Sequence, residues 1–117
     1  MLSPKLIQDI VAGQFGLTRV QLLGRSHRPH VVLARHIAML LCLEMVPYAS
    51  LSAVGDWFGG RDHTTVLHAR ERMRRRIAAD RKFAREVEDL RRQEGRLIQR
   101  LTAPRRPAAS GGLSLPQ

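Results

Sequence analysis

Apolar positions recur every three or four residues along most of the chain, a pattern that predicts an all-helical protein. The first such segment covers residues 4–15, where Ser3 supplies an N-cap and Pro4 suits the first helical position. Thr18 can cap a short second helix over residues 19–23. The chain is therefore expected to begin with two helices.

Residues 31–46 form a longer segment that is apolar nearly all round. A helix without a polar face is normally the buried central one. Arg35 and His36 are exceptions in its opening turns, and we expect them to emerge at the surface beside the basic loop that precedes the helix.

The next segments read as a helix-turn-helix unit. Ser50 or Ser52 can cap a helix that runs to residue 58, and two consecutive glycines form the turn after it. Asp62 stands where an N-cap is wanted, and the apolar spacing predicts a second helix from residue 64 to about residue 79.

The C-terminal part divides into a last helix, residues 81–101, which we expect Gly95 to interrupt, and a segment rich in Pro, Gly and Ser. Such a composition is typical of disorder. The predicted organisation is one helix-turn-helix domain over residues 1–101 and a disordered tail over residues 102–117.

The charge of the chain adds information about its partners. The sequence has 20 Lys and Arg and 10 Asp and Glu, for a net charge of +10. Eighteen of the basic residues are arginine, and residues 60–117 hold fifteen basic and seven acidic side chains. An excess of this size predicts a polyanionic partner, which is a nucleic acid, an anionic membrane or an acidic protein.

Several other classes are disfavoured. Cys42 is the only cysteine, so no intramolecular disulfide can form. The N-terminus lacks the pattern of a signal peptide, and the longest apolar run, residues 37–43, is far shorter than the roughly 20 residues of a membrane span. The five histidines lack metal-ligand spacing, and no catalytic set of side chains is recognisable. We expect a cytoplasmic protein that is not an enzyme and has no metal or other cofactor.

Polar side chains occupy the start of the second helix of the helix-turn-helix, where such a helix meets base edges in the major groove. Thr64 offers a methyl group to thymine and a hydroxyl to a base or phosphate, and His63 can donate or accept a hydrogen bond. Asp62 repels the DNA backbone, so it serves either as a helix cap or as a reader of cytosine N4.

The segment GGRDHTTVLHA, residues 59–69, resembles the signature of the C-terminal DNA-binding domain of the bacterial replication initiator DnaA. The upstream segments ARHIAMLL and SLSAVGDWFGG are also similar to that family, so the resemblance covers roughly residues 4–95. It implies a Trp-repressor-like helical domain that reads a short A·T-containing element of double-stranded DNA, the DnaA box.

The resemblance also implies the site residues. The major-groove readers would be Arg61, Asp62, His63, Thr64 and Thr65. In the family, the basic loop before the long helix inserts an arginine into the minor groove. Arg25 and Arg28 are the candidates here, while direct alignment places His27 at that point.

Contacts to the DNA backbone are expected from a second set of residues. Arg35 matches the arginine of the family's Arg-Gln pair and His36 replaces its glutamine, while His68 lies one turn beyond the readers. Arg70 and Arg72 follow directly behind the readers, where a phosphate contact and a merely solvated helix face are about equally expected.

The chain contains no G-x-x-x-x-G-K-[ST] motif, so we expect no ATPase of its own. The expected protein is a stand-alone, nucleoid-associated DnaA-like unit for origin binding in DNA replication initiation or its regulation, with replication initiator proteins as further partners. Two alternatives remain, a helix-turn-helix transcriptional regulator and a module that binds initiator proteins. An anionic-membrane binder is less well supported, because the first helix is poorly suited to a membrane surface.

Overall fold

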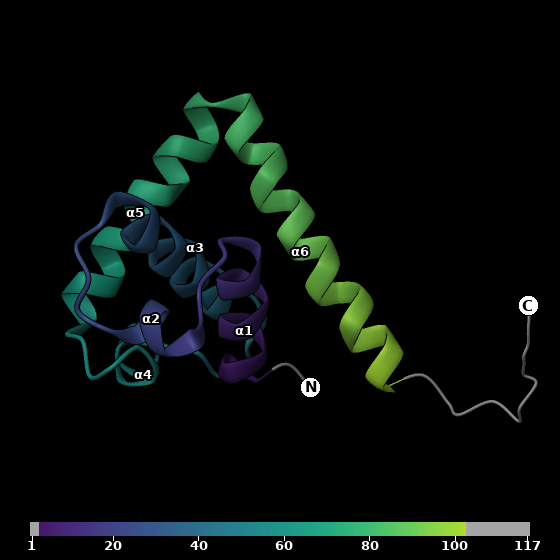
Figure 1. Ribbon diagram of the computed structural model, residues 1–117, viewed down its shortest axis with the longest axis horizontal. Helices are drawn as coiled ribbons and strands as arrows, with labels where there is room; N and C mark the ends of the chain where they lie inside the picture. The colour runs from purple at the N-terminus through teal and green to yellow at the C-terminus, as the bar shows by residue number, and fades with distance from the viewer. Residues whose placement is uncertain (1–2, 103–117) are drawn as a thin grey trace, which may run out of the picture.

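The computed structural model describes residues 3–102, with side chains to residue 96. Over this range the chain forms six helices and no strand (Figure 1): α1 (Pro4–Gln14), α2 (Arg19–Leu23), α3 (Pro29–Met45), α4 (Leu51–Trp57), α5 (His63–Ala79) and α6 (Arg81–Thr102). The prediction of an all-helical protein with a helix-turn-helix unit, here α4 and α5, is confirmed.

Side-chain caps fix where most of these helices begin. The side-chain oxygens of Ser3, Thr18, Ser50 and Asp62 each accept a hydrogen bond from a backbone N–H in the first turn of α1, α2, α4 and α5. Ser50 is therefore the cap of α4, and Ser52 is not. Because a cap is a local interaction, the caps of α1, α2 and α5 were predicted from the sequence, whereas the prediction for α4 left Ser50 and Ser52 open.

Several helix boundaries differ from the prediction by one or two residues, and a predicted break is absent. α3 begins at Pro29, two residues earlier than expected, because proline suits the first helical position. α6 continues through Gly95 to Thr102, so the predicted interruption is wrong. A glycine costs a helix only about 1 kcal/mol, and Leu90 and Glu94 are buried just before it. The predicted tail, residues 102–117, lies outside the described residues except for Thr102.

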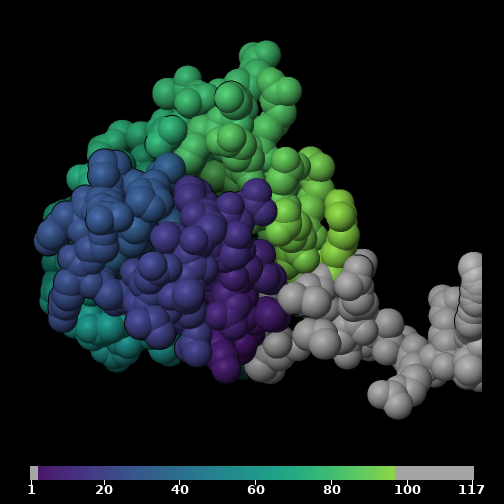
Figure 2. Space-filling model, viewed as in Figure 1, coloured from purple at the N-terminus to yellow at the C-terminus, as the bar shows by residue number. Residues whose placement is uncertain are grey.

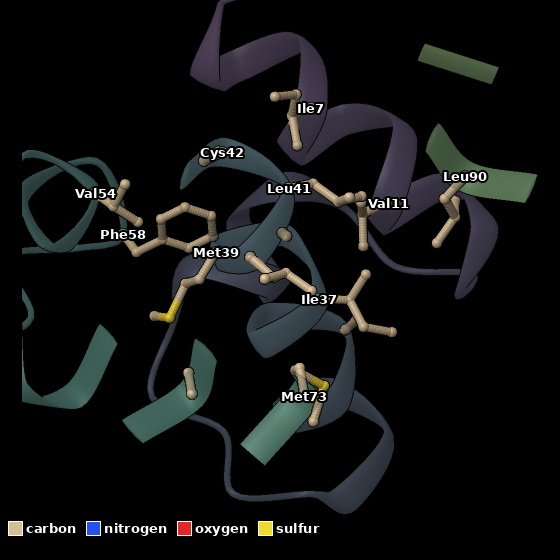
Figure 3. Close-up of a cluster of buried hydrophobic side chains, with 14 of the residues drawn as sticks. Ile7, Val11, Ile37, Met39, Leu41, Cys42, Val54, Phe58, Met73 and Leu90 are labelled. Atoms are coloured by element: carbon tan, nitrogen blue, oxygen red, sulfur yellow. The ribbon is translucent and has the colours of Figure 1, made fainter. Parts of the chain in front are cut away.

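The hydrophobic core is built around α3, which contacts α1, α2, α4 and α5. Figure 3 shows side chains from five helices and one helix cap that meet there and are at most 4% exposed: Ile7 and Val11 from α1, Ile37 and Leu41 from α3, Val54 from α4 with its C-cap Phe58, Met73 from α5 and Leu90 from α6. The segment that is apolar nearly all round is thus the central helix, as predicted.

The last two helices form an inverted V, with α6 returning along α1 (Figures 1 and 2). The loop between α2 and α3 and the helix-turn-helix turn lie at the left of this view, and α6 lies at the right. An ion pair between Arg91 and Glu44, with 2.9 Å between Nε and Oε1, ties α6 to the end of α3. None of the described helices is long and apolar enough to cross a bilayer.

Candidate nucleic-acid interface

The turn between α4 and α5 is held by close backbone contact. Gly59 and Gly60 have φ of 75° and 74°, a conformation that favours glycine. The Arg61 N–H donates to the Gly55 carbonyl oxygen over 2.9 Å, and a Cβ built on Gly55 would lie 2.1 Å from the Arg61 carbonyl oxygen. Glycine at these positions therefore sets the angle at which α5 leaves the turn.

The first turn of α5 exposes four polar residues in a row, from Asp62 to Thr65. Asp62 Oδ2 accepts a hydrogen bond from the Thr64 N–H over 3.0 Å and a second one from the Thr64 hydroxyl. The Thr64 hydroxyl bond, followed by its backbone bond, lowers the pKa of Asp62. His63 Nδ1 lies 3.5 Å from Asp62 Oδ1. Asp62 is thus a helix cap, and its exposed carboxylate still faces solvent.

The outer face of α5 continues this polar start. Val66, Ala69 and Met73 are buried against the core, so the opposite side of the helix faces outward. Thr64 and His68 are four residues apart and exposed, which places them on one face. Arg72 is exposed one turn further on that stripe, whereas Arg70 is half-buried.

The basic loop, residues 24–28, lies between α2 and α3. Arg25, His27 and Arg28 are exposed, and the Arg28 N–H donates to the hydroxyl oxygen of Ser26 over 3.2 Å. Arg25, Arg28 and His30 help to line a surface hollow of about 450 Å³ that no acidic side chain borders. Both candidate minor-groove arginines are therefore free to reach a ligand.

Arg35 and Arg61 face inward, onto backbone carbonyl groups. Arg35 is 5% exposed, so the expectation that it emerges at the surface is wrong, and its Nε donates to the Leu22 carbonyl oxygen over 2.7 Å. Arg61 is partly buried and donates to three carbonyl oxygens, which belong to Leu23, Gly24 and Phe58. Contacts from these two arginines to DNA stay a prediction.

These carbonyl contacts had no signal in the sequence. The Arg35 contact spans 13 residues, and the Arg61 contacts to the end of α2 span 37 and 38 residues. Composition and local spacing do not predict contacts between residues so far apart in the sequence. Arg61 was readable only as part of the polar segment that follows the glycine turn.

The region between the loop and α5 is strongly positive. His36 is half-buried beside it, and burial lowers its pKa to about 4, helped by the charges of Arg72, Arg35 and Arg61. Its imidazole is therefore neutral near neutral pH and can both donate and accept a hydrogen bond. Among the described residues, none of these three arginines makes an ion pair. Such a surface favours an anionic ligand.

A sequence model of the family described as "Bacterial dnaA protein helix-turn-helix" matches residues 4–73, which is more than half of the chain. The chain belongs to this family. The helix-turn-helix named in this description agrees with the α4–α5 unit of the structure. The match extends from the start of α1 into α5, so it includes the basic loop and the first turn of α5.

Three similar proteins are each named chromosomal replication initiator protein DnaA. The chain is 40% identical over 87 residues to that of Corynebacterium jeikeium, which covers 74% of this chain and 15% of the relative. It is 43% identical over 89 residues to that of Latilactobacillus sakei, which covers 76% of this chain and 20% of the relative. It is also 43% identical over 86 residues to that of Brucella abortus, which covers 74% of this chain and 17% of the relative. The chain thus spans 15–20% of the length of these DnaA relatives.

No group of three or more His, Cys, Asp or Glu side chains within the described part of this DnaA-family chain is arranged to hold a metal ion. Cys42 is free and buried in the core, where burial, followed by the nearby Glu94, raises its thiol pKa to about 12. The exposed side chains of the first turn of α5 and of the basic loop offer hydrogen-bonding groups and positive charge.

Proposed function

We propose that this domain binds double-stranded DNA in a sequence-specific manner at a DnaA-box-like element, and acts in replication initiation or its regulation. The observation that carries the proposal is the exposed first turn of α5, residues 62–65, beside an exposed basic loop in a member of the DnaA helix-turn-helix family. A recognition helix presents its first residues to base edges in this way.

The first turn of α5 would read bases in the major groove. Thr64 and Thr65 can contact the thymine methyl group, and His63 can accept from or donate to a base edge. Asp62 keeps exposed lone pairs beyond those that cap α5, so it can also accept from cytosine N4. The Arg61 guanidinium is engaged by three backbone carbonyl oxygens, so we assign base reading to residues 62–65.

The basic loop would enter the adjacent minor groove with Arg25 or Arg28, where the negative potential of A·T-rich DNA attracts arginine. Backbone contacts would come from Arg72 and His68 on the outer stripe of α5, with Arg70 and His36 behind them. Arg35 is 5% exposed, so it would act through its bonds to the Leu22 and Ser26 carbonyl oxygens and not by touching DNA. Exposed arginines of this kind supply affinity and register but carry no sequence information.

The proposal places the chain at an origin as a DNA-binding unit without an ATPase of its own, because the sequence has no phosphate-binding loop motif. A cytoplasmic location at the nucleoid and replication initiator proteins as protein partners belong to the same proposal. The positive charge of the chain favours a polyanion such as chromosomal DNA, and sequence reading would then select the site within it.

The experiment is selection of duplexes from a random library by the purified protein, followed by sequencing. We expect enrichment of one short motif with A·T pairs. Recovery of random sequence would overturn the sequence-specific function. A motif unrelated to the binding sites of the DnaA relatives would overturn the DnaA-box part and favour a transcriptional regulator.

A further inference from the structure

The turn of the helix-turn-helix is joined to the basic loop by one side chain. The Arg61 guanidinium donates from Nη1 to the Leu23 carbonyl oxygen over 3.1 Å and to the Phe58 carbonyl oxygen over 2.6 Å. Its Nη2 donates to the Gly24 carbonyl oxygen over 2.5 Å. One planar group thus holds the end of α4, the end of α2 and the start of the loop together.

A second arginine holds the same segment from the side of α3. Arg35 donates from Nε to the Leu22 carbonyl oxygen over 2.7 Å and from Nη1 to the Ser26 carbonyl oxygen over 3.3 Å. The last carbonyl groups of a helix have no partner inside it, so α2 would otherwise leave them to water. We call the two side chains and their carbonyl partners the arginine clasp.

Gly59 makes room for the clasp. A Cβ at this position would lie 3.0 Å from the Leu23 carbonyl oxygen and 3.1 Å from Arg61 Nη1. Its φ of 75° also favours glycine, so the turn is shaped both by backbone conformation and by the approach of the loop. The loop, the turn and the clasp therefore depend on one another.

The clasp is not an arrangement that stability alone would select. Burial, followed by the neighbouring arginines, lowers the pKa of both Arg35 and Arg61. Neither makes an ion pair among the described residues, and Arg35 Nη2 is buried without a hydrogen-bond partner there. Burying two cations side by side without a counter-charge opposes folding. Natural proteins keep such groups where they hold a functional geometry.

We propose that Arg61 and Arg35 are positioning residues that fix the basic loop, residues 24–28, relative to the first turn of α5. This inference rests on the proposed function and deepens it. Arg25 and Arg28 would meet the minor groove at a set distance from His63 and Thr64 in the major groove. The two reading elements then bind as one preorganised unit, and less entropy is lost in ordering the loop on DNA.

The test combines hydrogen exchange in the free protein with DNA binding. Arg61→Lys keeps the charge but loses the three-carbonyl geometry, and Arg35→Lys provides a second variant from the other side of the clasp. Arg74→Lys is the control, because Arg74 is exposed on α5 and makes no hydrogen bond or ion pair among the described residues. Far-UV circular dichroism checks that each variant is folded.

We expect amide exchange in residues 24–28 to rise at least about tenfold in the clasp variants and to stay unchanged in Arg74→Lys. We also expect the losses in affinity for the selected duplex to be non-additive when the substitutions are combined. Removing both loop arginines, Arg25 and Arg28, should weaken the wild type strongly and the Arg61→Lys protein only slightly, because a loose loop already contributes little.

Two failures are distinguishable. The positioning role is wrong if the wild type binds its selected site but the amides of the loop exchange at the same rate in Arg61→Lys and Arg74→Lys. It is also wrong if the losses in DNA affinity from the clasp and loop substitutions add. If the wild type prefers no duplex at all, the proposed function fails, whatever the exchange of the free loop.

Discussion

Gly55 offers a sharp test of how the helix-turn-helix turn is built. A Cβ at this position of α4 would lie 2.1 Å from the Arg61 carbonyl oxygen and 3.1 Å from its carbonyl carbon. Both are backbone atoms, which cannot rotate away as the end of a side chain can. Gly55→Ala therefore requires α4 and the turn to separate by roughly 1 Å to restore van der Waals contact.

The expected loss follows from three contributions. Overpacking of this kind costs about 1–3 kcal/mol. Separation also weakens the 2.9 Å hydrogen bond from the Arg61 N–H to the Gly55 carbonyl oxygen, which is worth about 1 kcal/mol. The higher helix propensity of alanine returns up to about 1 kcal/mol. Gly55→Ala should thus lower the free energy of unfolding by about 1–3 kcal/mol.

Gly13 provides the matched control, because it is exposed in α1 and a Cβ there would meet nothing within 4 Å. Gly13→Ala should stabilise the protein by about 0.5–1 kcal/mol. In thermal unfolding followed by circular dichroism, Gly55→Ala should lower Tm by about 5–20 °C and Gly13→Ala should raise it by a few degrees. Equal stability of the two variants would refute the close approach of α4 to the turn.

Three further predictions follow from single residues. Glu94 is fully buried, and burial, followed by the charge of Glu44, raises its pKa from 4.5 to about 8, while Arg91 opposes the shift. The unfolded chain therefore loses this proton first, so the free energy of unfolding should fall by on the order of 3–5 kcal/mol as pH rises from about 4.5 to 8. In urea titrations at several pH values, Glu94→Gln should reduce the dependence of the free energy of unfolding on pH, and substitution of the exposed Glu86 by Gln should not. Cys42 should react with a thiol reagent only as fast as the fold opens, and immediate labelling of the native protein would contradict its burial. Arg72→Ala should weaken specific and random DNA alike and reduce the salt dependence, measured by fluorescence anisotropy, whereas Arg74→Ala, turned about 200° away on α5, should leave both unchanged.

The sequence was sufficient where the structure depends on local interactions. The caps of α1, α2 and α5 and the glycine turn before α5 each act within a few residues, and all were predicted. The central position of α3 followed from its lack of a polar face. The polar start of α5 was likewise visible as a run of residues, and its exposure agrees with the reading role we propose.

The sequence was insufficient where side chains meet across the fold. Arg35 looked like a surface residue because a charge in an apolar helix is normally solvated, yet carbonyl groups of α2 and the loop surround it. Glu94 lies in a helix rich in charge and would be read as exposed, but the return of α6 onto the rest of the domain buries it near Glu44 at the end of α3. Both outcomes depend on helix packing that no local pattern encodes.

The central claim is that the first turn of α5 reads DNA sequence, and the direct test is the ratio of affinities for the selected duplex and a scrambled one. His63→Ala and Thr64→Ala should each weaken the selected duplex by about 1–3 kcal/mol, or roughly 5–150-fold, with little change on the scrambled duplex. Because Thr64 also bonds the cap Asp62, the folded state of each variant is checked by circular dichroism. Equal weakening on both duplexes would contradict the account, since these residues would then contribute attraction without sequence reading.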